Sequence, residues 1–298
     1  MARRQAQAQE TTARQAKLAA LRAQEARKRR QMMVTMGAIG LVLVVIVAFI
    51  IAKAVSGGSG PAASGKNGKV VSAVTSIPQR VFDKVGTGAL PKQVAPQHVP
   101  PGHALASSGK PEVLYVGAEY CPYCATERWP VVAALSRFGT FHDLGTTRSS
   151  STDAYPNTAT LSFHGASYDS KYLNFQGFET SDRQQAPLDS LPPAAQKAFR
   201  TLDAPPFQPA PGGSIPFIDF AGKYMIVGAS YDPQVLQGKN HLQIAQAMHD
   251  PSSDIAQGAD ATANMITAMV CTLTNQQPAK VCNSSGVQAA ATKFLGGS

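Results

Sequence analysis

The sequence predicts an α/β fold, and three kinds of segment carry that prediction. Val113–Val116 is a short run of β-branched and aromatic residues before a glycine, which is typical of a buried strand. Between Trp129 and Phe138, apolar residues recur at steps of three and four, which indicates a helix with one buried face. Further strand candidates lie at 141–147, 158–163 and 172–178, in a chain that also carries helical patterns.

The positive charge of the chain is concentrated at its start. The whole sequence has a net charge of +9, and residues 1–30 contain nine Lys and Arg against Glu10 and Glu25. The remaining residues are therefore close to neutral, and no aromatic side chains lie among the basic ones. This distribution does not support a nucleic-acid-binding surface. We expect residues 1–30 to form a basic cytoplasmic tail.

Residues 31–54 predict one transmembrane helix. The stretch from Gln31 to Ala52 has no charged residue and is long enough to cross a bilayer core. Basic residues at 27–30 precede it, so the positive-inside rule places the N-terminus in the cytoplasm and the rest of the chain outside. A cleaved signal peptide is the alternative, because Ala52-Lys53-Ala54 resembles a cleavage site.

A Gly- and Ser-rich linker at 55–69 separates this span from an extracytoplasmic domain at 70–298. The domain is expected to begin with an ordered segment, in which Ser76 caps a short helix that has Pro78 in its first turn. A proline-rich loop from Leu90 to Lys110 follows. Its two histidines, five residues apart, are too few to fill a metal site.

Cys121 and Cys124 lie where the predicted strand ends and the predicted helix begins. Free backbone N–H groups and the positive end of the helix dipole stabilise an anion there, so a cysteine in this position forms a thiolate more readily. A spacing of two residues lets the two sulfurs meet, and such a pair can cycle between dithiol and disulfide. Half of a zinc site has the same spacing, so the motif leaves both possibilities open.

The Glu119-Tyr120-Cys121-Pro122-Tyr123-Cys124 segment, together with Ile215-Pro216 downstream, resembles the thioredoxin superfamily with a Cys-Pro-Tyr-Cys box. The resemblance implies a thioredoxin-like domain with an insertion, at about 148–210, between the active-site helix and a hairpin of strands 217–220 and 224–227. It also implies that Cys121 is the exposed attacking thiolate and that Cys124 resolves the mixed disulfide. Ile215 and Pro216 would form a cis bond that contacts the substrate backbone. A trans proline on an edge strand is the alternative for Pro216.

The chain also resembles an uncharacterised family of bacterial and archaeal membrane-anchored proteins that have a thioredoxin-like domain. That likeness rests on the Val116–Trp129 segment, on the Ile215-Pro216 hairpin and on the late cysteine pair, and it covers most of residues 70–298. It leaves the substrate unnamed.

Three helices are expected in the second half of the chain, at 190–202, 231–249 and 254–273. Asn240 is expected to cap a helix within the second of these segments. Cys271 and Cys282 lack the two-residue spacing, so in an oxidising compartment they predict a structural disulfide. A second redox pair and a four-cysteine zinc site are the alternatives.

These observations predict a membrane-anchored, extracytoplasmic thiol–disulfide oxidoreductase that needs no cofactor or metal and acts on cysteines of exported proteins. A membrane redox partner is a further expectation. The resemblance puts Tyr115 at the position of the superfamily's buried acid, where it cannot serve as a carboxylate. We expect Glu119 and Glu127 to be solvated surface charges, and the alternative is that one of them replaces this acid. The alternatives are a redox-inert thioredoxin-like binding module of the cell envelope, and a metal-handling protein that uses Cys121, Cys124 and a histidine.

Overall fold

The computed structural model describes residues 67–107, 109–209 and 212–296. The predicted tail at 1–30, the predicted span at 31–54 and nearly all of the linker lie outside these residues. Among the helices that are described, none is both long and apolar enough to cross a membrane.

The α-helices are α2 (Gly68–Thr75), α3 (Gln79–Val85), α4 (Pro122–Leu135), α5 (Pro193–Leu202), α6 (His241–Ala247), α7 (Asp254–Leu273), α8 (Ala279–Cys282) and α9 (Ser285–Phe294), and the short 3-10 helices are η1 (Lys92–Val94) and η2 (Pro233–Leu236). The strands are β1 (Gln97–His98), β2 (Ala106–Ser107), β3 (Lys110–Gly117), β4 (Thr140–His142), β5 (Gly145–Arg148), β6 (Ala159–Ser162), β7 (Ser167–Asp169), β8 (Asn174–Glu179), β9 (Phe217–Phe220) and β10 (Tyr224–Val227).

The main sheet is mixed, and β3 lies at its centre. β3 pairs in parallel with β8, where Tyr115 is opposite Gly177, and antiparallel with β9, where Tyr115 is opposite Ile218. β9 and β10 form the expected hairpin, and β1 pairs with β10 at the edge. A parallel pair needs a long crossover, and α4 lies in the connection between β3 and β8.

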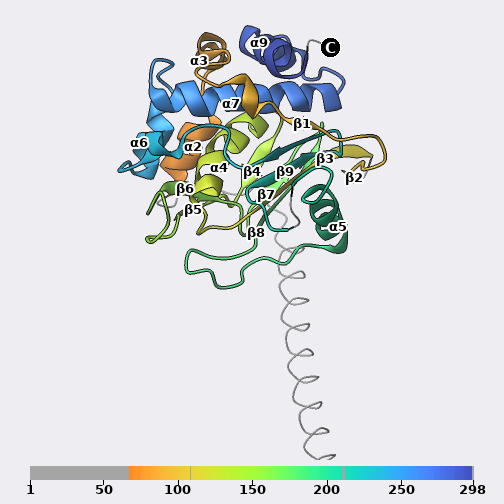
Figure 1. Ribbon diagram of the computed structural model, residues 1–298. Helices are drawn as coiled ribbons and strands as arrows, with labels where there is room; N and C mark the ends of the chain where they lie inside the picture. The colour runs from red at the N-terminus through yellow and green to blue at the C-terminus, as the bar shows by residue number, and fades with distance from the viewer. Residues whose placement is uncertain (1–66, 108, 210–211, 297–298) are drawn as a thin grey trace, which may run out of the picture. The chain divides into compact units, whose positions relative to one another are not determined.

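Helices cover both faces of this sheet, so alternate residues of β3 belong to different cores. Val113 and Tyr115 pack in the larger core, to which α4 and α7 contribute. Leu114 and Val116 pack in a smaller core with Leu202 of α5. Figure 1 shows α5 on the opposite side of the sheet from α4 and α7. A strand that is buried on both faces reads as a continuous apolar run, which is why 113–116 is apolar throughout.

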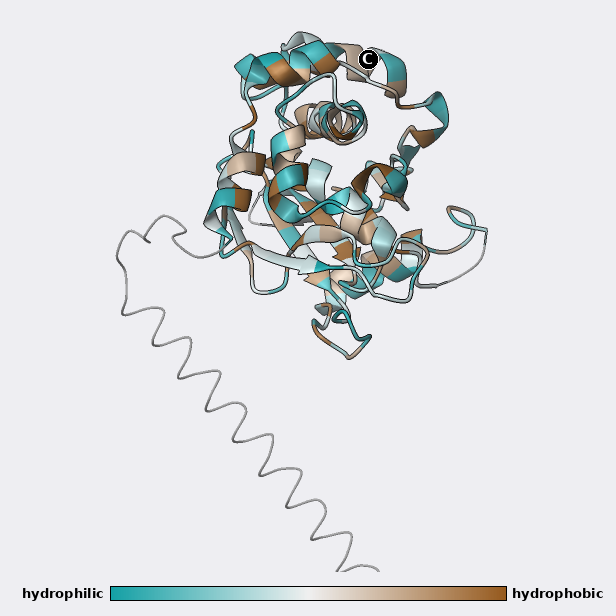
Figure 2. Cartoon of the chain, turned by 90° about the vertical axis from the view of Figure 1, so that its left-hand side faces the viewer, coloured by the Kyte–Doolittle hydropathy of each residue, from teal (hydrophilic) through white to brown (hydrophobic). Residues whose placement is uncertain are grey.

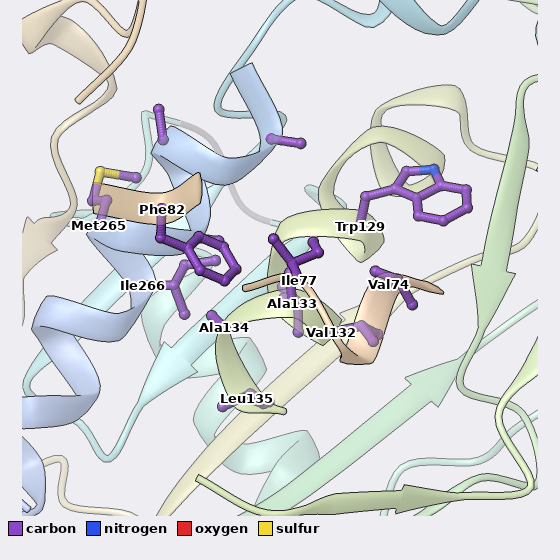
Figure 3. Packing of buried hydrophobic residues seen from close by; sticks show 14 of the residues in the cluster. Val74, Ile77, Phe82, Trp129, Val132, Ala133, Ala134, Leu135, Met265 and Ile266 are labelled. Atoms are coloured by element: carbon purple, nitrogen blue, oxygen red, sulfur yellow. The ribbon is translucent and has the colours of Figure 1, made fainter. Parts of the chain in front are cut away.

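The larger core is built from helix on helix. In Figure 3, Phe82 of α3 lies near Ile266 of α7, and Val132 of α4 lies near Val74 of α2. The view in Figure 2, a quarter turn from Figure 1, looks along α7 and shows other helical segments around it. Sixteen of the twenty residues of α7 are buried, so this helix is a central element of the domain.

Several elements have the bounds that the sequence predicts. Two others are each divided into two shorter elements. The bounds of β9, β10 and α7 agree with the prediction. The strand predicted over 141–147 is wrong in its middle, because Asp143 has a φ of 54° and separates β4 from β5. The helix predicted over 231–249 is reduced to η2 and α6. Asn240 caps α6 as expected, since its side chain accepts from the N–H of Gln243.

Two segments of the domain are assigned differently in sequence and structure. α2 begins at Gly68, inside the predicted linker, and its buried Val70 and Val74 lie one helical turn apart. The segment predicted as an insertion, at about 148–210, contributes to the main fold. It contains β8, which is a strand of the central sheet, and α5, which covers one face of that sheet.

Cys271 and Cys282 form the predicted disulfide, with the two sulfurs 2.00 Å apart. The bond joins the last turn of α7 to the end of α8, and both residues are buried. Cys121 and Cys124 are free thiols. The four cysteines therefore separate into one disulfide and one dithiol.

Candidate functional site

The dithiol lies at the N-terminus of α4, directly after β3. Cys121 is the N-cap residue, and its sulfur accepts a hydrogen bond from the backbone N–H of Cys124 at 3.3 Å. Pro122 follows at the first helical position, where a missing N–H leaves no hydrogen bond unmade. The sequence folds this way because the strand ends at Gly117 and the cysteine itself caps the helix.

This setting favours a thiolate on Cys121. The pKa of the Cys121 thiol is lowered to about 7, chiefly by a hydrogen bond from the Cys124 side chain. Backbone hydrogen bonds and the positive charge of Arg128 act in the same direction, while burial opposes them. Burial and the hydrogen bond to Cys121 raise the pKa of the Cys124 thiol well above its ordinary value. One sulfur is therefore prepared to ionise while the other keeps its proton.

The resemblance to the thioredoxin superfamily implies an exposed Cys121, but this residue is buried in the structure. It keeps only 5 % of its surface open, and Cys124 keeps none. The covering group is the hairpin loop, since the Cys121 thiol donates to the carbonyl oxygen of Ile215 at 3.8 Å. Because Cys121 is slightly exposed and Cys124 is not, the sulfur of Cys121 is the one that a partner reaches first.

Ile215 and Pro216 lie beside the dithiol, and the bond between them is cis. Gly228, directly after β10, donates its N–H to the carbonyl oxygen of Pro216 at 2.8 Å. The loop that enters the hairpin is thus tied to the segment that leaves it. The structure brings together all four residues that the sequence proposes for the site.

Two polar groups near the dithiol differ from their predicted surroundings. Glu127 is fully buried and does not act as a surface charge, because its carboxylate accepts from both the N–H and the hydroxyl of Ser230 at 2.9 Å. Glu119 is half-buried and accepts from the hydroxyls of Thr147 and Ser162. Tyr115 is fully buried, and its hydroxyl has no hydrogen-bond partner among the described residues.

An ion pair beneath the dithiol was not predicted from the sequence. Arg128 of α4 and Glu179 of β8 are both fully buried, and their side chains meet in two hydrogen bonds of 2.8 and 2.5 Å. The carboxylate raises the pKa of Arg128, against the effect of burial, so the guanidinium stays charged. The sequence does contain one sign of this ion pair. Arg128 lies seven residues after Cys121 and therefore on the same side of the helix, which places a cation on the face of the dithiol.

Two loops hold the segment that leads into Cys121. The N–H of Ser150 donates to the carbonyl oxygen of Tyr120, and the N–H of Glu119 donates to that of Ser181. Between these loops lies a polar hollow of about 310 Å³, lined by Ser150, Ser151, Thr152, Arg183, Gln184 and Gln185. Its hydroxyl, amide and guanidinium groups could hydrogen-bond the backbone of an extended peptide.

A second, more apolar cavity of about 450 Å³ lies beside the loop that follows β10. Leu90, Pro91 and Val94 contribute to its apolar wall, and Ser230 and Tyr231 also line it. Because Ser230 also donates to Glu127, the wall of this cavity is joined by hydrogen bonds to α4.

Over residues 67–107, 109–209 and 212–296, no group of three or more His, Cys, Asp or Glu is arranged to hold a metal ion. The ring of His98 lies tilted against Tyr224, and His103 meets Phe207 edge to face, so both rings have aromatic neighbours. The arrangement around Cys121 is that of a dithiol beside a buried ion pair.

Fold and site together define a mixed α/β protein that presents a dithiol at the N-terminus of a buried helix. The chain belongs to the family described as "Domain of unknown function (DUF929)", which matches residues 101–204 and 209–272, more than half of its length. The match includes the dithiol, the Ile215-Pro216 loop and nearly all of α7. No curated protein and no solved structure matches the chain.

The burial of Glu127 predicts a pH dependence of stability. Burial raises the pKa of this carboxyl from 4.5 to about 7, although the bonds from Ser230 oppose the shift. Between these values the folded chain holds a proton that the unfolded chain has released. The free energy of unfolding should therefore fall as the pH rises through this window, and Glu127 should account for about 3 kcal/mol of the loss.

A Glu127→Gln variant should lose that part of the pH dependence, measured by urea unfolding of the full-length chain at pH 5 and pH 8. Ser136→Ala, at the other end of α4, removes no titrating group and serves as the matched control. Equal pH dependence in the Glu127→Gln variant and the wild type would contradict the assignment.

Proposed function

We propose that this protein is a membrane-anchored, extracytoplasmic thiol–disulfide oxidoreductase with a thioredoxin-like domain, acting on cysteines of exported proteins. The observation that carries the proposal is the Cys121 sulfur, which caps α4 beside its partner thiol and has a pKa lowered to about 7. Near neutral pH about half of it is thiolate, against a few per cent for an ordinary cysteine.

Two features of the fold support the thioredoxin-like part of the proposal. The order of β3, α4 and parallel β8, followed by the antiparallel hairpin of β9 and β10, fits the framework that the sequence resemblance implies. The loop before β9 contacts the Cys121 sulfur through the Ile215 carbonyl. The membrane anchor and the outward orientation rest on the sequence of residues 1–54.

One round of exchange uses only the two sulfurs and the substrate. The structure holds these sulfurs as a dithiol, so the oxidising direction also needs the membrane redox partner to return the pair to the disulfide. In the oxidising direction, a substrate thiolate attacks Cys121 of the Cys121–Cys124 disulfide, and Cys124 leaves as a thiolate that takes up a proton. A second substrate thiolate then attacks the substrate sulfur of the mixed disulfide and releases Cys121. Two electrons and two protons pass from the substrate dithiol to the protein, and the reverse sequence reduces a substrate disulfide.

The test uses the full-length chain in detergent. The expected result is exchange with a dithiol peptide or a protein disulfide, together with a measurable equilibrium between the Cys121–Cys124 pair and glutathione. A reduction potential near roughly −270 mV would make the protein a reductant, and one near roughly −120 mV a disulfide donor. A pair that exchanges with neither thiols nor disulfides would overturn the proposal.

The low exposure of Cys121 favours a second candidate, a redox-inert binding module of the cell envelope. In that case alkylation of Cys121 by iodoacetamide should be slow despite its lowered pKa. Cellular function should then survive in a Cys121→Ser/Cys124→Ser variant. Fast alkylation and loss of function in this variant would support the oxidoreductase.

A further inference from the structure

We propose that Arg128 is a positioning residue for the dithiol, whose buried cation stabilises the Cys121 thiolate and so makes the Cys121–Cys124 pair a stronger oxidant. This inference rests on the proposed function and names the group that sets its direction.

The helix places Arg128 on the same side as the two sulfurs. Cys121, Cys124 and Arg128 follow one another at steps of three and four residues, the spacing of neighbours on one helical face. Arg128 is fully buried, so its cation lies in a medium that screens it far less than water. A buried charge on this face therefore acts strongly on an anion that forms at the end of the helix.

The guanidinium is held by groups that differ in charge. Its Nε and Nη2 donate to the carboxylate of Glu179, and Nη2 also donates to the carbonyl oxygen of Ala118 at 2.7 Å. Ala118 lies in the segment that leads into Cys121, so the same side chain fixes the position of the first sulfur. Arg128 thereby connects β8, α4 and the entry to the dithiol.

The remaining nitrogen of Arg128, Nη1, is buried and has no partner in the described part of the chain. The hydroxyl of Tyr115 is also buried without a hydrogen-bond partner. Tyr115 can place its hydroxyl here only because residue 117 is a glycine, since a Cβ at that position would lie 2.6 Å from the hydroxyl oxygen. Neither group bonds a sulfur in the described residues, but both residues interact electrostatically with the two thiols. Two donors without partners thus lie in the surroundings of the dithiol, where a buried thiolate is costly without donors.

The charges agree with this arrangement. Arg128 lowers the pKa of both thiols, and for Cys124 its effect is larger than the opposite effect of Glu179. Stabilising the thiolate stabilises the reduced form of the pair, and a pair with a stable reduced form takes electrons from other dithiols more readily. The carboxylate of Glu179 thus makes burial of Arg128 possible without cancelling its effect on the sulfurs.

The test compares reduced full-length chains by thiolate absorbance at 240 nm against pH, and by equilibration with glutathione. Arg128→Met/Glu179→Gln removes both charges and keeps an acceptor for the N–H of Phe163. It should raise the pKa of Cys121 by about one unit. At pH 7 the equilibrium constant should move about twofold toward the disulfide. At pH 9, where the wild-type Cys121 is almost wholly thiolate, it should move about tenfold, equivalent to about 30 mV. Arg128→Lys keeps the charge and should stay near the wild type.

Arg137→Met is the matched control. Arg137 is a half-buried arginine just after α4, and its guanidinium bonds Gln79 of α3 and Asn264 and Thr267 of α7. Its loss should lower stability and leave the Cys121 titration unchanged. The inference is overturned if the neutral pair variant, shown to be folded by circular dichroism, titrates like the wild type. A wild type that exchanges with no substrate would reject the proposed function, while the titration would still decide the role of Arg128.

Discussion

A Cys121→Ser variant should reduce thiol–disulfide exchange to the background rate. Serine has the size of cysteine and can cap α4 equally well, so the helix should persist. Its oxygen cannot form a disulfide, so the first covalent step is lost. The measurement is oxidation of a dithiol peptide by the full-length chain, with the wild type in parallel.

Cys124→Ser should behave differently, because it retains the attacking sulfur and removes the one that resolves the intermediate. With a peptide disulfide as the substrate, the Cys121 thiolate should attack one sulfur and displace the other as a thiolate. The mixed disulfide between Cys121 and the peptide should then accumulate, visible as an adduct in non-reducing electrophoresis. If Cys121→Ser retained exchange, or if Cys124→Ser turned over without an adduct, the assignment of the two roles would be wrong.

The control for these variants is the other cysteine pair. Cys271→Ala/Cys282→Ala should keep exchange activity, since that disulfide lies at the far end of α7. It should lower the free energy of unfolding by about 3 kcal/mol, the loop-closure entropy of a segment of this length. Loss of exchange in a folded variant would instead make Cys271 and Cys282 a second redox pair.

Local signals in the sequence predicted much of this fold. The continuous apolar run at 113–116 marks a strand that is buried on both faces, and the bounds of β9, β10 and α7 follow from their apolar patterns. The position of the dithiol is likewise a local property, because it depends on a strand and a helix that are adjacent in the chain. Such features can be read because the interactions that form them span few residues.

The surroundings of the dithiol could not be predicted in the same way. The apolar pattern of α4 predicts one buried face, yet every residue of this helix except Tyr123 is buried. Glu127 is therefore a buried carboxyl, and Arg128 forms its ion pair with Glu179, 51 positions later in the chain. An ion pair of this kind depends on which later strand lies parallel to β3, and several strand candidates between α4 and β9 were equally suitable.

Breaking that ion pair should have the largest effect on stability. Arg128→Met leaves the Glu179 carboxylate buried with no cation beside it, and removal of one partner of a buried pair costs about 3–5 kcal/mol. Arg128→Met/Glu179→Gln leaves no buried charge at this place, so it should recover most of the loss. The measurement is urea unfolding at pH 7 of the wild type, the single variant and the double variant.

The stability and the redox effects of Arg128 can be separated by this pair of variants. If the double variant is nearly as stable as the wild type but its Cys121 pKa is raised, the ion pair is retained for its effect on the sulfurs and not for folding. If the double variant is as unstable as Arg128→Met, the hydrogen bonds of Arg128 to Ala118 and Glu179 stabilise the fold themselves. A buried charge is expensive to solvate in the protein interior, and a pair that adds little net stability is best explained by the chemistry next to it.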